Sequence, residues 1–228
     1  MFDYFLFEAY YRGGFEEIKK RKSIFLKYFM EREDVLDIGC GRGEFLSLLK
    51  EHGIKARGID LDDDMIVYCR NEGLDVKKAD LFTYLEKEVK DNSLGGIFMG
   101  QVIEHLPPQG LLRMLSLTYN KLKKDCYIVM TTPNPLNLLV GAANFYMDLT
   151  HVRPLHPETL KFAVESANFR EVDVIFFSPV DEDAKLKKIP LSQISNDSKN
   201  GFNIINENID KLNRILFVEQ DYAVVGRM

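Results

Sequence analysis

Glycines and a preceding carboxylate form the part of the chain with the clearest chemistry. The stretch VLDIGCGRGEF reads as an apolar strand, a turn and the start of a helix. The turn contains Gly39, Gly41 and Gly43. Glycine lets the backbone adopt positive φ and approach a ligand closely. Because Asp37 precedes the turn and would repel a phosphate, the turn suits a nucleotide-like ligand that carries positive charge. Cys40 lies in the same turn and belongs to the predicted site.

A second acid follows the next predicted strand. Asp60 lies 23 residues after Asp37, a separation that suits a strand, a turn, a helix and another strand. An acid at this place accepts hydrogen bonds from ribose hydroxyls, and Leu61 beside it completes this part of the site. A nicotinamide dinucleotide would require glycine or alanine where Glu44 stands. S-adenosylmethionine fits both acids, because its ammonium and sulfonium groups suit Asp37 and its ribose suits Asp60. The alternative is a structural turn with a solvated Asp60.

Polar residues also follow the third and fourth predicted strands. They are candidates because open α/β sheets bind ligands beyond the carboxyl ends of their strands. Asp80 and Leu81 follow the third strand, where the carboxylate can accept from the exocyclic amine of an adenine. Alternatively, Asp80 only caps the following helix. Gln101, Glu104 and His105 follow the fourth strand.

Alternating strands and helices must position these residues. We predict strands near residues 34–38, 56–60, 74–78, 95–100, 126–132, 171–177 and 220–227. Helices are predicted near residues 43–52, 62–72, 81–90, 108–123 and 157–167. This rhythm is typical of an α/β fold with a doubly wound, seven-stranded, mostly parallel sheet of the Rossmann-like type.

We predict a single domain over residues 1–228, with an N-terminal helical extension. Its parts are a helical cap at 1–31, a cofactor-binding core at 34–180 with an acceptor-site insertion at 136–156, a polar, turn-rich and mobile excursion at 181–216, and the final strand at 219–228. The aromatic residues of the cap are expected to pack on the sheet. A partner or a peripheral membrane surface is the alternative for them.

Composition excludes several classes of function. The net charge of −5 argues against broad binding to nucleic acid. The sequence lacks an apolar run of about 18 residues and a signal-peptide pattern, so we expect no transmembrane segment. Three cysteines without a C-x-x-C pair indicate reduced thiols and a cytoplasmic location.

Longer segments resemble a known family. They are YYRGGFEEI, LDIGCGRGEFL, QVIEHLPP, TPNPLNLLVGAANFYMDLTHVRPLHPETL and DYAVVGRM. Over roughly residues 34–177 and the final strand, the chain resembles class I S-adenosylmethionine-dependent methyltransferases. It is most similar to the methyltransferase portion of O-antigen chain-terminating enzymes. The resemblance implies a cofactor site lined by Gly39, Gly41, Asp60, Asp80 and Gln101 and covered by Tyr11 and Arg12.

The resemblance also bears on the acceptor. It implies terminal sugars or sugar phosphates of surface polysaccharides, and thus lipopolysaccharide or polysaccharide modification. The bifunctional members continue into a kinase domain for which this sequence has no counterpart, so we do not expect coupled phosphorylation.

The predicted catalytic residues are Glu104, His105, His151 and Arg153. Methyl transfer from a sulfonium is an in-line displacement that depends largely on positioning, but a hydroxyl acceptor gains from a general base. His105 can supply that base if its pKa is near neutrality, unless Glu104 and His105 only fix their loop. Arg153 can grip phosphate or carboxylate, unless it pairs with Asp148 or Glu158.

We expect no metal. Small-RNA 2′-O-methyltransferases and some quinone-pathway O-methyltransferases bind a divalent cation with E-x-x-E-H, but Gln101 stands here in place of the first acid. Losing a carboxylate weakens a site for a hard cation.

The prediction for the whole chain is an S-adenosylmethionine-dependent O-methyltransferase. Its acceptor would be a sugar, a sugar phosphate or a related small polar molecule or glycan, and its product from the cofactor is S-adenosylhomocysteine. One alternative is a quinone-precursor or other small-molecule methyltransferase. The other is a module that binds S-adenosylmethionine without turnover.

Overall fold

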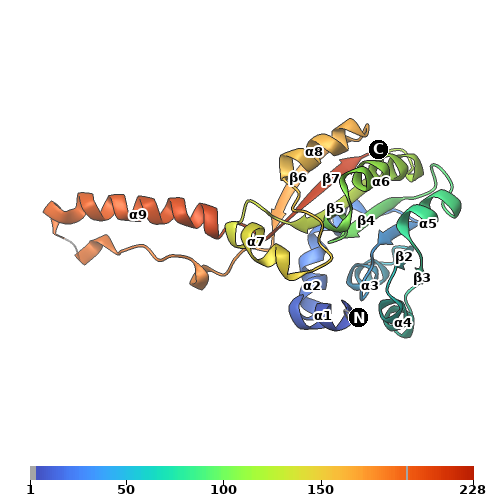
Figure 1. The fold of residues 1–228 in the computed structure, drawn as a ribbon, viewed down its shortest axis with the longest axis horizontal. Helices are drawn as coiled ribbons and strands as arrows, with labels where there is room; N and C mark the ends of the chain where they lie inside the picture. Colours follow the sequence, from blue (N-terminus) through green and yellow to red (C-terminus); the bar gives the residue numbers. More distant parts are fainter. Residues whose placement is uncertain (1–3, 194) are drawn as a thin grey trace.

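A single twisted sheet organises the chain in the computed structural model, which describes residues 4–193 and 195–228 (Figure 1). The strands are β1 Val35–Ile38, β2 Ala56–Asp60, β3 Val76–Lys78, β4 Gly96–Gly100, β5 Tyr127–Pro133, β6 Arg170–Phe177 and β7 Asp221–Arg227. Their order is β3-β2-β1-β4-β5-β7-β6. β7 is antiparallel to β5 and β6, and the other neighbouring pairs are parallel. The predicted α/β fold and its mostly parallel, seven-stranded sheet are confirmed.

Helices cover both faces of this sheet. The five predicted in the core are present as α3 Glu44–Glu51, α4 Asp63–Asn71, α5 Leu81–Lys87, α6 Pro108–Lys121 and α8 Pro157–Ser166. On one face, Leu85 of α5 and Leu115 of α6 pack into the same core as Leu36 of β1. On the other face, Phe45 of α3 stacks on Phe98 of β4 with ring centroids 3.8 Å apart. β1 is buried at every position because it is covered from both sides.

The N-terminal extension contains α1 Tyr4–Tyr11, α2 Phe15–Lys22 and the 3₁₀ helix η1 Ser23–Tyr28. Phe25 and Phe29 are fully buried against the sheet, as expected for the cap aromatics. Tyr10 and Tyr11 instead remain largely exposed. The first three residues of the predicted cap lie outside the described residues.

The excursion between the last two strands is more regular than predicted. It contains the 21-residue helix α9 Asn196–Leu216, which the sequence analysis missed. In Figure 1 α9 and the segment before it form an arm that extends away from the sheet. Apolar residues recur every three or four positions in α9, at Phe202, Ile205, Ile209, Leu212 and Leu216. The asparagines between them have low helix propensity, so the composition of the segment favoured turns over a helix.

The predicted insertion after β5 contains α7 Leu138–Ala142 and the 3₁₀ helix η3 Asn144–Met147. Asn137 caps α7, because its side chain accepts from the amides of Leu139 and Val140. The insertion therefore forms a folded wall beside the carboxyl end of β5. Of the described helices, none combines the length and the apolar character that a membrane crossing needs.

Candidate active site

The glycine turn between β1 and α3 has the geometry that the sequence predicts. Gly39, Gly41 and Gly43 have φ of 67°, 54° and 79°. A Cβ on Gly39 would lie 2.4 Å from Val102 Cγ2, and one on Gly43 would lie 2.4 Å from Leu74 Cδ1. Glycine is required at these two positions by conformation and by space.

Asp60, at the end of β2, is hydrogen-bonded to the glycine turn. Its Oδ2 accepts from the Gly41 amide at 2.8 Å, and its Oδ1 accepts from the Asp62 amide at 3.0 Å. Burial raises the pKa of Asp60, and these amide hydrogen bonds oppose that rise. A carboxylate has about four acceptor sites, so Asp60 can still accept from a ribose hydroxyl.

Asp37 lies beneath the turn as a buried carboxylate. Its Oδ2 has no hydrogen-bond partner among the described residues. Burial raises the pKa of Asp37 to about 7; the Lys22 charge opposes this rise, and the nearby Glu44 and Asp60 add to it. A cationic ligand group beside this oxygen would supply the missing stabilisation, which is the chemistry that the sequence predicts for this acid.

The other predicted cofactor residues lie along the same edge of the sheet. Leu61 and Asp80 are exposed, and Leu81 is half-buried. Asp80 caps α5 by accepting from the amide and the hydroxyl of Thr83 through Oδ1, and its role toward an adenine stays a prediction. Cys40 is buried, and a hydrogen bond with Cys69 together with burial raises its thiol pKa. Cys40 therefore offers its backbone, not its sulfur, to a ligand.

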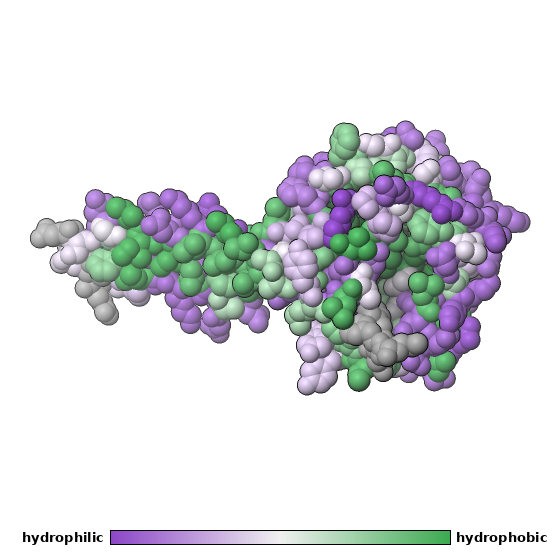
Figure 2. All heavy atoms as spheres, in the orientation of Figure 1, coloured by the Kyte–Doolittle hydropathy of each residue, from purple (hydrophilic) through white to green (hydrophobic). Residues whose placement is uncertain are grey.

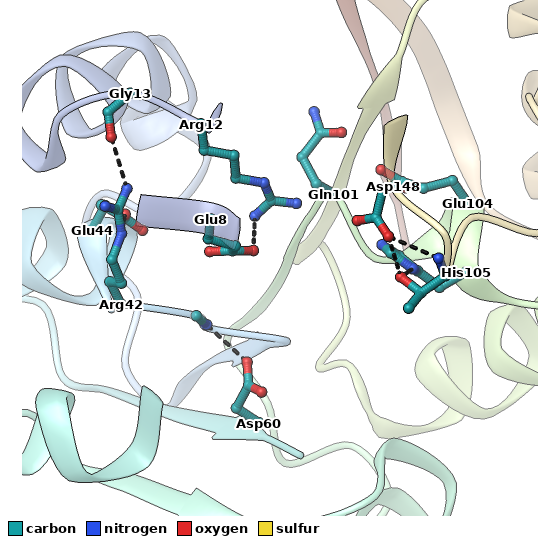
Figure 3. A network of polar contacts seen from close by, with 12 residues as sticks. Glu8, Arg12, Gly13, Arg42, Glu44, Asp60, Gln101, Glu104, His105 and Asp148 are labelled. Atoms are coloured by element: carbon teal, nitrogen blue, oxygen red, sulfur yellow. Dashed lines mark hydrogen bonds and ion pairs between the residues drawn. The ribbon is translucent and has the colours of Figure 1, made fainter. Parts of the chain in front are cut away.

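Helix α1 crosses over the glycine turn (Figure 3). Glu8 is buried there and forms a 2.6 Å ion pair with Arg12. A Cβ on Gly41 would lie 3.6 Å from Glu8 Oε2, so this carboxylate sits directly above the turn. Arg42, from the turn itself, donates to the Gly13 carbonyl at 3.1 Å and fixes the N-terminal segment. Sequence reasoning placed Arg12 over the cofactor but missed Glu8.

A cavity of about 360 Å³ opens next to α1 and α2. Predicted cofactor residues Tyr11, Arg12 and Gln101 line it together with Asp148 and His151 of the predicted acceptor region. Its apolar wall is formed by Phe7, Val140, Phe145, Met147 and Phe177. The structure thus brings the N-terminal extension and the insertion together around one space.

Arg21 is a cation of this cavity that the sequence analysis did not single out. Its Nη2 donates to the Arg12 carbonyl at 3.3 Å, and its Nε is buried without a hydrogen-bond partner. Within the described part of the chain it takes part in no ion pair under 4 Å, whereas Lys22 pairs with Glu44 at 3.3 Å. Arg21 belongs to a basic run, Lys19 to Lys22, that resembles an ordinary solvated helix face, so no local signal marked this residue.

Gln101 connects the cavity to the final strand. It adopts a left-handed conformation, with φ of 60°, and its Nε2 donates to Asp221 Oδ1 at 3.1 Å. Asp221 is half-buried, and burial raises its pKa although the Ser178 hydroxyl and the Arg21 charge oppose the shift. Asp221 was not predicted, because its partner lies 120 positions earlier in the chain.

Glu104 and His105 lie in the 3₁₀ helix η2 Ile103–His105, where His151 approaches them. Glu104 is fully buried; its Oε2 accepts from the Thr132 hydroxyl at 3.0 Å, and its Oε1 has no partner among the described residues. His151 Nε2 lies 4.0 Å from that Oε1. Burial raises the pKa of Glu104 to about 7. The described residues that could hold a metal ion are Glu104, His105 and His151.

Both histidines are neutral at pH 7. Burial, reinforced by the charge of His151, lowers the pKa of His105 to about 4, and burial lowers the pKa of His151. The general-base hypothesis for His105 required a pKa near neutrality, and this structure instead gives Glu104 a value in that range. Thr150 connects His105 to Asp148 through contacts of 2.9 and 2.6 Å. The loop-fixing alternative is therefore partly realised.

Arg153 is exposed and is not among the described residues that line the cavity. It forms no ion pair under 4 Å with Asp148, Glu158 or another described residue. Its role as an anion-binding residue stays a prediction.

Comparisons with known proteins agree with this arrangement. A family model described as a methyltransferase domain matches residues 9–174. A solved SAM-dependent methyltransferase from Archaeoglobus fulgidus is 46% identical, with 99% of each chain covered and a TM-score of 0.91. A methyltransferase structure from Mesorhizobium loti has 16% identity, covers 94% of this chain and 100% of its own, and has a TM-score of 0.64, which shows a shared fold.

A curated relative from Mycolicibacterium smegmatis, named "Probable S-adenosylmethionine-dependent methyltransferase", is 26% identical over 144 residues. The match covers 62% of this chain and 54% of the relative, so the chain spans about half the length of that protein. The similarity to O-antigen chain-terminating enzymes stays a prediction. Since a family model matches most of the chain and a 46% identical methyltransferase shares nearly all of its fold, the chain belongs to the S-adenosylmethionine-dependent methyltransferases with the class I fold.

Proposed function

We propose that this methyltransferase methylates an oxygen of a sugar, a sugar phosphate or a related small polar acceptor in the cytoplasm. The observation that carries the proposal is Arg21, whose guanidinium faces the cavity without a carboxylate partner within 4 Å among the described residues. A planar guanidinium binds phosphate or carboxylate through two parallel hydrogen bonds. The cavity thus supplies a place for an anionic group of the acceptor.

The rest of the wall suits hydroxyl groups. Asp148, Gln101 and Asp221 contribute carboxylate and amide groups to the same cavity. These residues can donate to or accept from the hydroxyls of a sugar ring. The resemblance to O-antigen chain-terminating enzymes implies the same class of acceptor. The apolar wall offers packing for a ring face, so an aromatic quinone precursor is the competing acceptor.

The cofactor, when bound, supplies a sulfonium methyl group for in-line displacement. The residues of the chain position the two reactants: the glycine turn, Asp37 and Asp60 hold the donor, and Arg21 holds the acceptor. The attacking hydroxyl must lose a proton as the new bond forms. The pair of His151 and Glu104 suits this step, because His151 lines the cavity, its Nε2 lies 4.0 Å from the buried Glu104 Oε1, and burial raises the pKa of Glu104 to about 7.

An acceptor screen tests this function. Purified protein would be incubated with ¹³C-methyl S-adenosylmethionine and matched sugars, sugar phosphates and catechols, with formation of S-adenosylhomocysteine as the readout and NMR to locate the methyl group. We expect turnover with a sugar or sugar phosphate. Methylation of catechols alone would favour the quinone-precursor alternative, and cofactor binding without turnover on any acceptor class would favour the binding module.

A variant pair tests the role of Arg21. Arg21→Met should raise KM for a phosphorylated acceptor at least tenfold and leave cofactor Kd unchanged, because the guanidinium faces the acceptor cavity. Lys20→Met is the matched control, since Lys20 is exposed on the same helix. Equal KM values for the two variants would contradict the assignment of Arg21 to the acceptor.

A further inference from the structure

We propose that Glu104, His105 and His151 form a binding site for a divalent transition-metal cation. One ligand atom from each residue lies within 4.8 Å of the other two. His151 also lines the cavity, as does the adjacent Asp148. An ion bound to these residues would therefore lie at the wall of the space that the acceptor is proposed to occupy.

The first observation is the unsatisfied oxygen of Glu104. The side chain is fully buried, its Oε2 is held by Thr132, and its Oε1 has no hydrogen-bond partner among the described residues. The contact from Oε1 to His151 Nε2 is 4.0 Å, too long for a hydrogen bond. Two ligands of one tetrahedral zinc ion, each bound at about 2.0–2.1 Å, lie about 3.4 Å apart. A small closing movement would bring both atoms to one ion.

The second observation is the orientation of the two imidazoles. His151 Nδ1 lies 2.7 Å from the Phe145 carbonyl, which can only accept, so the proton is on Nδ1 and the lone pair is on Nε2. The Thr150 hydroxyl has one proton and directs it to Asp148 at 2.6 Å, so its 2.9 Å contact with His105 Nδ1 requires a ring N–H there. Nε2 is again the nitrogen with the lone pair. Metal-binding histidines are held in this way by carbonyl, hydroxyl and carboxylate partners.

The donor set determines the kind of ion. Two imidazoles and one carboxylate favour zinc, manganese, iron or cobalt over magnesium, which prefers oxygen ligands and retained water. Three protein ligands with an open position are typical of catalytic sites. In the role that follows, which rests on the proposed function, the open position would bind the acceptor oxygen and favour its deprotonation. The ion would then replace Glu104 as the group that promotes proton loss, because Oε1 would be a ligand.

This inference departs from the expectation that no metal is used. That expectation depended on Gln101, which replaces the first acid of a motif. The structure directs Gln101 to Asp221 and brings His151, from the insertion, next to Glu104. The proposed ligand set therefore does not include position 101, and the missing carboxylate is replaced by an imidazole from a distant part of the chain.

A cobalt titration tests the site without any methyl transfer. The full-length protein, stripped with EDTA and free of cofactor, would be titrated with Co²⁺ and followed by visible absorption and calorimetry. We expect one ion per chain, and at least tenfold weaker binding in Glu104→Gln and in His151→Gln. His52→Gln is the control, because His52 ends α3 and bonds to the Leu48 carbonyl. Circular dichroism and Tm would confirm that each variant is folded.

Two results would overturn the site: no saturable Co²⁺ binding by the wild-type protein, or binding that both ligand variants retain. The outcomes are separable from those of the acceptor screen. Sugar methylation by a protein that binds no Co²⁺ would remove the metal site and keep the proposed function. Specific Co²⁺ binding with no turnover on any sugar would keep the site and remove that function.

Discussion

Two carboxylates share an unusual environment on the two sides of the site. Asp37 and Glu104 are both buried, each has one oxygen without a partner among the described residues, and burial raises the pKa of each to about 7. A buried carboxylate without a counter-charge is costly to the folded protein. Such groups persist where a ligand supplies the missing interaction. We therefore interpret both as positions prepared for a cationic or proton-bearing partner.

The first prediction concerns proton release at Asp37. Without cofactor, the folded protein retains a proton on Asp37 that an unfolded chain, with a pKa of 3.8, would have released. The free energy of unfolding therefore falls, through Asp37, as pH rises from about 4 to about 7. A bound cation beside Asp37 would lower its pKa, so cofactor binding below pH 7 should release a proton. Affinity should then rise by up to about tenfold per pH unit and level off above pH 7.

Calorimetry in buffers of different ionisation enthalpy measures this proton. At pH 6 the wild-type protein should release close to one proton per cofactor bound, and Asp37→Asn should release fewer. Equal proton release by the two proteins would assign the effect to another acid, such as Glu8 or Asp60, whose pKa values burial also raises.

The second prediction concerns Asp60. Asp60→Asn should weaken cofactor binding by roughly 1–3 kcal/mol, the range for hydrogen bonds to a charged group. Asparagine keeps one oxygen for the Gly41 amide, so the glycine turn should survive better than with alanine. Asp63→Asn is the control, because Asp63 is exposed on α4 and pairs with Lys78. Unchanged cofactor affinity in a folded Asp60→Asn protein would remove the ribose role.

At the scale of elements, the strand ends explain what the sequence could predict. The glycine turn, Asp60 and Asp80 follow their strands directly, so a local pattern was enough to place them on one edge of the sheet. Glu8 and Arg21 belong to a helical extension whose docking on the turn depends on Arg42. The approach of His151 to Glu104 depends on how the insertion folds back. Nothing in the local sequence encodes these long-range contacts.

The third prediction separates conformation from space within the glycine turn. Gly39→Ala and Gly41→Ala both place alanine at a positive φ, which costs roughly 1–2 kcal/mol. Only Gly39→Ala also drives its Cβ to within 2.4 Å of Val102, whereas Gly41 has its nearest neighbour at 3.6 Å. Gly39→Ala should therefore lower Tm more than Gly41→Ala does. Equal Tm values would show that the loop of Val102 relaxes freely.

At the scale of the whole molecule, the arm formed by α9 and residues 185–193 is the part furthest from the sheet (Figure 1). Figure 2 shows apolar residues along it, and Leu186, Ile204, Ile205, Leu212 and Ile215 are exposed there. The base of the arm is tied to the segment that follows β5, because Asn134 and Asn137 donate to the carbonyls of Glu219 and Val218. The arm thus has a fixed base next to the cavity and a free outer half.

Two asparagine side chains hold the extended segment of the arm against α9. Asn206 accepts from the Ile189 amide at 2.8 Å and donates to its carbonyl at 3.0 Å. Asn213, two helical turns later, makes the same pair of bonds with Leu186, at 3.0 and 2.9 Å. An asparagine amide in this position replaces the neighbouring strand that the extended backbone lacks. The segment is consequently ordered by side chains of one helix face.

The last prediction follows from this geometry. Asn206→Ala should speed hydrogen exchange at the Ile189 amide, and Asn213→Ala at the Leu186 amide, each by roughly fivefold, since a net hydrogen bond contributes about 1 kcal/mol. Cofactor affinity should not change, because both asparagines bond within the arm, to Ile189 and Leu186, and not to the glycine turn or Asp60. Asn208→Ala is the matched control on an exposed position of the same helix. Exchange at both amides that equals the control would mean that the arm is not closed in solution, and its apolar residues would then be accessible from both sides.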